Sequence, residues 1–412
     1  MAEVLRLGFA GLGEAAALVL PEISRLPYIS VTAAADLRPE ARDRFRQEFE
    51  GDAFESVDAM CASSNVDAVY VATPHQFHAE HSIVALEHDK HVIVEKPMAL
   101  SIADAERMNE TADQRGLKLM CGHTKSFDPP IRRMRQIIAS GDLGRVCMIN
   151  TWNYNDFMVR PYPDAEMTVS QGVVLNQGPH QVDVVRLLGG GLVRSVRART
   201  GAWDPTRPPG AYVCYLEFED GAVATLVFTG YGYFDTAELT WWLGEASYPG
   251  RNQDARRAFN KIRGPDQERI LQQVKNQTRY GGPGARGSDH GGGTGADYGW
   301  GEHRSMSHTV GRQRFYGLTV VTCERGEMRQ SQDGILIYGD EEITEVAIGE
   351  TLFGRQAEIT ELYEAVVHDK PMFHDGRWGE ATLEVCLGIL ASAADRREIM
   401  MSHQTPVVDT NS

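Results

Sequence analysis

The sequence of 412 residues has few cysteines, and no two of them lie close together. The six cysteines are spread along the chain, and none forms a Cys-x-x-Cys motif. Closely spaced cysteines are the usual sign of a disulfide framework or a zinc site, so the sequence predicts neither. This usage is typical of a protein of the reducing cytosol. We therefore predict a cytoplasmic protein without a bound metal.

Long apolar segments are also missing. A membrane-spanning helix needs about 20 consecutive apolar residues, and no window of the sequence reaches that length. The first residues, MAEVLRLGFAGLGEAA, lack the basic region and the cleavage site of a secretory signal peptide. We therefore expect a soluble chain whose first apolar residues form a strand.

Basic residues are outnumbered by acidic ones. Asp and Glu total 57 and Lys and Arg total 41, giving a formal net charge of -16. Such a surface repels nucleic acid and anionic membranes, so a small molecule is the expected partner. The chain is longer than one hydrophobic core requires. Its composition, with 42% hydrophobic and 24% charged residues, is typical of globular proteins. We expect two folded domains.

A glycine-rich turn follows the first apolar run. Residues 4–10 are too few for a helix, and the helix-like segment EAAALVLPEI begins directly after the turn. Gly-x-Gly-x-x-Ala between a strand and a helix is a form of the dinucleotide-binding fingerprint, because small residues permit a tight turn and close approach of a pyrophosphate. The helix start adds free N–H groups. This motif predicts a dinucleotide site that includes Gly11, Gly13, Glu14 and Ala15.

Asp36 ends the second apolar run, 23 residues after Gly13. At that separation a carboxylate binds the ribose 2′-hydroxyl of the cofactor, which favours NAD over NADP. Arg38 leaves NADP open, because a guanidinium could hold a 2′-phosphate. A helix cap near residues 39–49 is the alternative role of Asp36. We predict NAD, with Asp36 and Arg38 in its site.

Valine-rich runs at residues 66–73, 91–97 and 117–123 alternate with helix-like stretches. Continuous apolar strands separated by helices predict an α/β fold with a doubly wound parallel sheet. We place this N-terminal Rossmann domain at residues 1–125. Ligands of such sheets bind beyond the carboxyl ends of the strands. Candidates at those ends include Thr73, Pro74, Glu95, Lys96 and Pro97.

We assign the remaining residues, 126–412, to a second domain. AYVCYLEFEDG and AVATLVFTGYG mix apolar and polar residues and meet at a turn, which predicts an antiparallel sheet. Periodicity then fades between about 246 and 312, and residues 281–301 contain ten glycines, so we expect a mobile insertion there.

The insertion is basic. Residues 250–314 hold twelve Lys or Arg and six Asp or Glu. Arginine can bind a carboxylate through paired hydrogen bonds, so the insertion is suited to an anionic substrate, although a solvated loop would have the same composition. Its His290, His303 and His308 lack acidic or thiol partners at ligand spacing, and we assign no metal.

Seven features of the sequence occur together: AGLGEAA at 10–16, Asp36, TPHQFHAE at 73–80, EKP at 95–97, FDP at 127–129, GDLG at 141–144 and GPHQVD at 178–183. Together they resemble the Gfo/Idh/MocA oxidoreductase family. The resemblance implies a Rossmann domain followed by an α/β domain whose large, mostly antiparallel open sheet covers the nicotinamide and often forms the subunit interface. We therefore expect a homo-oligomer. By the same resemblance the cofactor is expected beside Thr73, Pro74, His78, Glu95, Lys96 and Pro97, with a cis peptide bond before Pro97.

The resemblance also implies catalytic residues. It puts Lys96 beside the nicotinamide and the substrate hydroxyl, with His180 as the acid/base partner. Asp183, three residues further along a helix, shares a face with His180 and could orient its imidazole. Asn176 stands where the family usually has an acid, and its amide can hydrogen-bond a substrate oxygen but cannot accept a proton. We predict all four residues to be catalytic.

Within the family, the insertion and residues 315–340 are most similar to the phthalate 4,5-cis-dihydrodiol dehydrogenases. That similarity implies NAD-dependent oxidation of a carboxylated cyclic cis-dihydrodiol, giving 4,5-dihydroxyphthalate and driven by aromatisation. Two alternatives remain open at this point. One is a sugar or inositol dehydrogenase of the same family, and the other is a non-catalytic sensor that binds the dinucleotide.

Overall fold

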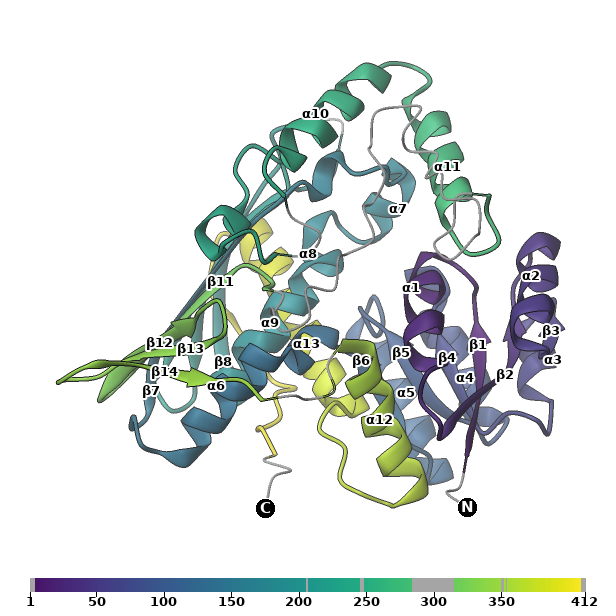
Figure 1. The fold of residues 1–412 in the computed structure, drawn as a ribbon, viewed down its shortest axis with the longest axis horizontal. Coiled ribbons are helices and arrows are strands. Elements are labelled where there is room, and N and C mark those ends of the chain that lie inside the picture. Colours follow the sequence, from purple (N-terminus) through teal and green to yellow (C-terminus); the bar gives the residue numbers. More distant parts are fainter. Residues whose placement is uncertain are drawn as a thin grey trace.

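The computed structural model describes residues 4–204, 207–244, 248–283, 315–349, 352 and 354–408. The chain forms two α/β lobes, each built on one sheet (Figure 1). Most of the predicted glycine-rich stretch, with its three histidines, lies outside the described residues. Among the helices in these ranges, none has both the length and the apolar composition needed to cross a membrane.

The first lobe contains the predicted parallel sheet. Its six strands follow the order β3-β2-β1-β4-β5-β6, and every neighbouring pair is parallel. The central strands are buried on both faces, as their continuous apolar sequences predict. The doubly wound fold is therefore confirmed. The strands are β1 (Leu5–Ala10), β2 (Ile29–Ala35), β3 (Asp52–Phe54), β4 (Ala68–Val71), β5 (His91–Glu95) and β6 (Leu119–Gly122).

A helix from far along the chain completes this lobe. Helix α12 (Gly354–Val367) contributes Ile359, Leu362 and Tyr363 to the core that also contains Leu7 of β1. Residues 1–125 therefore contain all six strands of the sheet but not the whole lobe, because α12, from much later in the chain, packs on α1. The other helices are α1 (Glu14–Ile23), α2 (Pro39–Phe49), α3 (Val57–Cys61), α4 (His78–Glu87) and α5 (Ile102–Arg115), with the 3₁₀ turn η1 (His75–Phe77) before α4.

The second lobe contains a nine-stranded sheet in the order β14-β13-β12-β11-β7-β10-β9-β8-β15. All neighbouring pairs are antiparallel except β7 and β10, so the predicted, mostly antiparallel sheet is confirmed. The strands are β7 (Val146–Tyr154), β8 (Val193–Gly201), β9 (Ala211–Phe218), β10 (Val223–Thr229), β11 (Leu318–Cys323), β12 (Gly326–Gln330), β13 (Gly334–Tyr338), β14 (Ile343–Ala347) and β15 (Ile399–Met400).

In the described part of the chain, the helices of this lobe lie mainly on one face of the sheet (Figure 1). On the other face, large apolar side chains are exposed, including Trp152 at 47% and Val213 at 57%. Helices α9 and α13 contact the covered face. The helical elements of this lobe are η2 (Thr124–Phe127), α6 (Pro129–Ser140), η3 (Phe157–Val159), α7 (Asp164–Val169), α8 (Val173–Asn176), α9 (Gly178–Leu188), η4 (Thr236–Thr240) and α13 (Gly376–Asp395).

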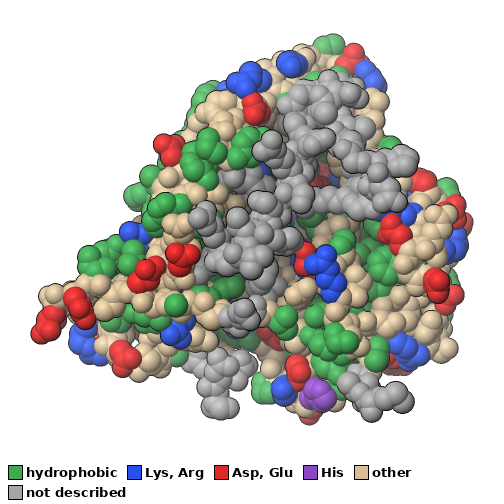
Figure 2. Space-filling model, viewed as in Figure 1, with side chains coloured by type: hydrophobic (Ala, Val, Ile, Leu, Met, Phe, Trp, Pro, Cys, Tyr) green, Lys and Arg blue, Asp and Glu red, His purple; other side chains and the backbone are tan. Residues whose placement is uncertain are grey.

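Part of the predicted mobile insertion is a packed pair of helices. Helices α10 (Arg251–Ile262) and α11 (Gln267–Thr278) extend from the second lobe toward α1 of the first, and we call residues 251–283 the arm (Figure 1). Ala255, Phe259 and Ile262 follow helical spacing and are buried in one small core with residues of α11. The structure thus differs from the expectation of mobility here. Basic side chains gather along the upper edge of the molecule, where α10 lies (Figure 2).

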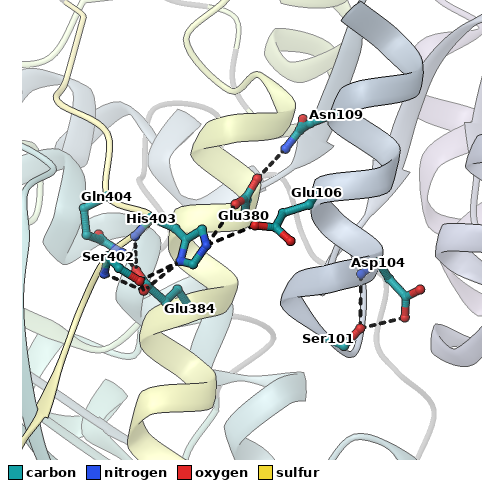
Figure 3. Close-up of polar contacts among 9 residues, drawn as sticks. All are labelled: Ser101, Asp104, Glu106, Asn109, Glu380, Glu384, Ser402, His403 and Gln404. Atoms are coloured by element: carbon teal, nitrogen blue, oxygen red, sulfur yellow. Dashed lines mark hydrogen bonds and ion pairs between the residues drawn. The ribbon is translucent and has the colours of Figure 1, made fainter.

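The C-terminal residues are attached to α5 and α13 by His403 (Figure 3). Its ring nitrogens lie 3.0 Å from Glu384 Oε1 and 3.2 Å from Glu106 Oε1. Hydrogen bonding to Glu384 raises the pKa of His403, although partial burial opposes the rise. Glu106, Glu380 and His403 also place donor atoms within 4.8 Å of one another, close enough for a metal ion. The ion pairs of His403 with these carboxylates already account for that arrangement.

Replacing His403 with Gln should destabilise the protein more at pH 6 than at pH 9. The pKa of His403 is higher in the folded than in the unfolded chain. The stabilisation of the folded state by His403 is therefore complete below its pKa in the unfolded chain, about 6.5. It is lost as the pH rises through the pKa of His403 in the folded chain. Thermal midpoints of both proteins across this pH range test the expectation. A difference in midpoint that does not vary with pH would contradict it.

Candidate active site

The turn after β1 has room for an anionic group. Gly11 has φ +92°, and a Cβ atom there would lie 2.9 Å from the Ala72 carbonyl oxygen, so only glycine fits. A Cβ atom at Gly13 would meet nothing closer than 3.9 Å. Helix α1 has no side-chain cap hydrogen bond at Gly13, so its first N–H groups lack the partner that a capping side chain would supply. These features suit the pyrophosphate of a dinucleotide.

Asp36 lies against this turn. Its Oδ2 accepts a hydrogen bond from the Leu12 N–H at 2.8 Å, and its Oδ1 accepts one from the Arg38 N–H at 2.9 Å. The Arg38 guanidinium donates to both oxygens, at 3.1 and 3.2 Å. All four acceptor positions of the carboxylate are thus used. For Asp36 to bind a ribose, the ribose hydroxyls must replace bonds from Arg38.

Lys96 follows directly after β5, and the peptide bond from Lys96 to Pro97 is cis, as expected. The buried His78 ring joins this segment to the end of β4. Its nitrogens lie 2.8 Å from the carbonyl oxygens of Thr73 and Pro97. Each ring nitrogen therefore faces a backbone carbonyl oxygen, and the nitrogen that carries the proton donates to the oxygen beside it. These contacts tie the segments after β4 and β5 together, and the contact of His78 with the cofactor stays a prediction.

Glu95 pairs with other groups of the protein, and its contact with the cofactor stays a prediction. Its carboxylate is buried and lies 2.6 Å from Arg355 Nη2 and 3.0 Å from the Tyr70 hydroxyl. Burial alone would raise the pKa of Glu95, but Arg355 holds it below the usual value. Burial raises the pKa of the adjacent Glu358 to about 7. Glu95 thus joins a buried ionic cluster with residues of α12. Its side chain and that of its neighbour Lys96 point in opposite directions, because successive side chains along an extended strand lie on opposite faces.

Lys96 reaches from the first lobe to the second. Its ammonium Nζ donates to the carbonyl oxygen of Asn176 at 2.9 Å. The Asn176 side chain accepts a hydrogen bond from Gln177 at 2.8 Å. Asn176 ends α8 and lies four residues before His180, which is in the first turn of α9. The structure therefore brings Lys96, Asn176 and His180 together between the lobes.

His180 is buried beside several cations. Burial lowers its pKa well below the usual value, and Lys96 and Lys125 lower it further. The imidazole is therefore neutral at neutral pH and can accept a proton. Its ring makes an edge contact with Tyr316, with centroids 5.3 Å apart, and Lys125 Nζ lies 5.6 Å from the centroid of that tyrosine ring. The sequence interpretation did not single out Lys125 or Tyr316.

Asp183 does not contact the imidazole as predicted. Its Oδ1 accepts a hydrogen bond from the Trp378 indole at 2.7 Å. The Nδ1 atom of His180 has no hydrogen-bond partner within the part of the chain that the structure describes. Although the two residues share a helix face, Asp183 is fully buried against α13 and joins α9 to it. The predicted orienting hydrogen bond is therefore absent from the described contacts.

A polar pocket adjoins His180. Arg160 and Arg251 both bond to Asp156, at 2.7 and 2.8 Å, and both line the pocket. Gln177 and Tyr316 line it as well, and their side chains are joined by a 3.0 Å hydrogen bond. Arg251 begins the arm, so one basic residue of the insertion does reach this region. The sequence predicts that the basic insertion binds an anionic substrate, but no pattern in it distinguishes Arg251 from the other basic residues.

Comparison with known proteins agrees with these features. Residues 5–123 match the model of the Gfo/Idh/MocA oxidoreductase family with an NAD-binding Rossmann fold, and residues 131–242 match that of the family's C-terminal domain. The chain is 35% identical over 396 residues to the "1-carboxy-3-chloro-3,4-dihydroxycyclo hexa-1,5-diene dehydrogenase" of Comamonas testosteroni, covering 94% of each protein.

Solved structures share both lobes. A crystal structure of a Bordetella bronchiseptica RB50 protein has a TM-score of 0.83 and 35% identity, covering 97% of this chain and 100% of that one. The WlbA dehydrogenase of Bordetella pertussis, solved with NADH and UDP-GlcNAcA, has a TM-score of 0.65 at 20% identity, with coverage of 97% and 99%. That second likeness concerns the fold alone. The chain thus belongs to the Gfo/Idh/MocA oxidoreductase family and is a dehydrogenase with an NAD-binding Rossmann domain.

Proposed function

We propose that the protein oxidises a secondary alcohol of a carboxylated cyclic cis-dihydrodiol. The observation that carries the proposal is the meeting of Lys96 and His180 from different lobes, next to a pocket lined by two arginines. NAD, when bound, accepts the hydride from the carbinol carbon. Gly11, Gly13, Glu14 and Ala15 would hold its pyrophosphate at the start of α1.

Lys96 and His180 would handle the hydroxyl proton. The Lys96 ammonium can donate a hydrogen bond to the substrate oxygen and stabilise its negative charge as the proton leaves. The neutral His180 imidazole can accept that proton. Asn176 contributes its backbone carbonyl, which orients Lys96 at 2.9 Å. In this scheme Asp183 fixes the helix that carries His180 and takes no part in proton transfer.

The substrate carboxylate would bind near Arg160 and Arg251. The pocket lining also contains the carboxylates of Asp156 and Asp235, so a substrate carboxylate would bind these guanidinium groups in place of an aspartate. Phthalate 4,5-cis-dihydrodiol, with 4,5-dihydroxyphthalate as product, is our specific proposal. This choice of substrate rests on the resemblance of the insertion and of residues 315–340 to the phthalate 4,5-cis-dihydrodiol dehydrogenases. The name of the Comamonas relative describes a ring diol with one carboxyl group.

The proposed activity is tested by mixing the protein with NAD and a panel of alcohols. We expect NADH absorbance to appear with carboxylated cis-dihydrodiols and not with inositol or glucose. Activity confined to inositol or sugars would instead support the alternative family activity. NAD binding without turnover of any alcohol would support the sensor.

Replacing Arg251 with Gln should raise KM for a carboxylated dihydrodiol at least about tenfold, because a charge-assisted hydrogen bond is lost. The effect on kcat should be smaller, since Arg251 lies away from Lys96. Steady-state kinetics with a carboxylated and an uncarboxylated diol measure this difference. Arg257→Gln on the same helix is the matched control, because Arg257 is 67% exposed and pairs with Asp254. Equal KM changes for both diols would contradict carboxylate recognition.

We also propose that a second copy of this chain covers the open face of the nine-stranded sheet. Trp152 and Val213 are among several apolar side chains exposed on that face. Light scattering of the purified protein measures the mass, and a monomer would refute this arrangement. That nucleic acid and membranes are not partners stays a prediction from the net charge.

A further inference from the structure

The arm reaches the dinucleotide turn of the first lobe. The Tyr280 N–H donates to the Gly13 carbonyl at 3.4 Å, and Arg38 donates to the Tyr280 carbonyl at 2.9 Å. The Tyr280 side chain is also held, because its hydroxyl donates to Glu48 at 2.6 Å and the Arg44 guanidinium lies 4.9 Å from its ring centroid. The end of the arm is thus fixed beside both elements that would hold NAD.

Arg279 precedes Tyr280, so these contacts also fix its backbone. Its Nε atom is buried and has no hydrogen-bond partner among the residues that the structure describes. Burial lowers the pKa of Arg279, and Arg38 lowers it further, while Asp36 and Glu166 act in the opposite direction. The guanidinium therefore lies within electrostatic reach of both lobes. An unpaired buried donor is costly, so the environment of Arg279 is suited to an anion that is bound during function.

The pyrophosphate is the group that fits this environment. Even when the ribose displaces its bonds to Asp36, Arg38 still donates to the carbonyl oxygens of Leu12 and Tyr280, so few of its donors are left for a phosphate. Arg279 is the neighbouring guanidinium with an unmet donor, and Tyr280 beside it bonds to Gly13 of the turn. Arg279 therefore lies next to the residue that contacts the turn before α1.

We infer that Arg279 binds the pyrophosphate of NAD and that the arm forms one wall of the cofactor site. Residues 251–283 lie outside both ranges that match the family models. The inference rests on the NAD-binding role of the first lobe and is independent of the diol reaction. The arm therefore joins the arginine pocket at one end, through Arg251, to the cofactor at the other.

The test is NADH binding by Arg279→Gln, measured without substrate by calorimetry or by NADH fluorescence. We expect at least about tenfold weaker binding of both NADH and ADP-ribose, because one charge-assisted hydrogen bond is lost. Adenosine, which carries no phosphate, should bind equally to both proteins. Arg279→Lys should recover part of the affinity, since it keeps the charge. Arg257→Gln serves as the control and should match the natural protein.

Unchanged NADH affinity in Arg279→Gln would overturn the inference. So would a loss confined to NADPH, which would assign Arg279 to a 2′-phosphate, or an equal loss for adenosine, which would indicate displacement of the whole arm. None of these results depends on turnover. A protein that binds NADH normally and oxidises no diol would overturn the proposed reaction alone.

Discussion

Replacing Lys96 with Met is expected to lower turnover of a cyclic diol at least about a hundredfold, while NADH binding is retained. Met has a similar length and fills the same space, but it offers no hydrogen-bond donor to the substrate oxygen. General acid/base groups contribute about a hundredfold to ten-thousandfold to rates of this kind. The Asn176 carbonyl also loses its 2.9 Å partner, which should loosen the contact between the lobes at the reacting centre.

The measurement pairs single-turnover kinetics with NADH affinity. Lys90→Met is the control, because Lys90 lies just before the other end of the same strand, where its Nζ donates to the Ser63 carbonyl. We expect ordinary turnover from that variant. Unchanged turnover in Lys96→Met would remove Lys96 from the mechanism. A parallel loss of NADH affinity would mean that the substitution disturbs the cofactor site rather than the proton path.

Replacing Arg355 with Met should destabilise the protein by about 3–5 kcal/mol. Arg355 is 18% exposed and pairs with both Glu95 and Glu358, which are buried. Removing one partner of a buried ionic cluster leaves uncompensated charge, which costs about this much. Because burial already raises the pKa of Glu358 to about 7, the loss should be larger above pH 7 than below it, where this carboxyl becomes protonated.

Denaturant midpoints give the size of this effect. Arg377→Met is the matched control, because Arg377 is 58% exposed and pairs with the exposed Asp113, and such pairs contribute less than about 1 kcal/mol. Adding Glu358→Gln to Arg355→Met should recover part of the loss, since it removes one of the two unpaired carboxylates. An Arg355 variant as stable as the Arg377 variant would show that the cluster has no net stabilising role.

The features predicted correctly from the sequence have local causes. The glycine turn after β1 and the valine-rich strands are encoded by adjacent residues, because a strand buried on both faces needs continuous apolar side chains. The family motifs supplied Lys96 and His180, whose side chains come close only because two lobes meet. Their roles in catalysis stay predictions until the kinetics are measured.

The features that sequence interpretation missed depend on distant partners. Asp183 bonds to Trp378, which is 195 residues away. No pattern near His180 in the sequence indicates that this indole, and not the imidazole, bonds to Asp183. Glu95 likewise pairs with Arg355 of the distant helix α12. The helices of the arm were overlooked because the many glycines that follow them dominated the composition of the segment. The spacing of Ala255, Phe259 and Ile262 was the available signal.

Helix α12 has a consequence for how this protein can be divided. The polypeptide leaves the nucleotide-binding lobe after β6, builds the large sheet, and comes back more than 200 residues later to insert Ile359 and Leu362 into the first core. A fragment cut at residue 125 would expose the apolar surface of α1. Neither half can therefore be transplanted as a module, and any chimaera must carry residues 354–367 together with the first 125.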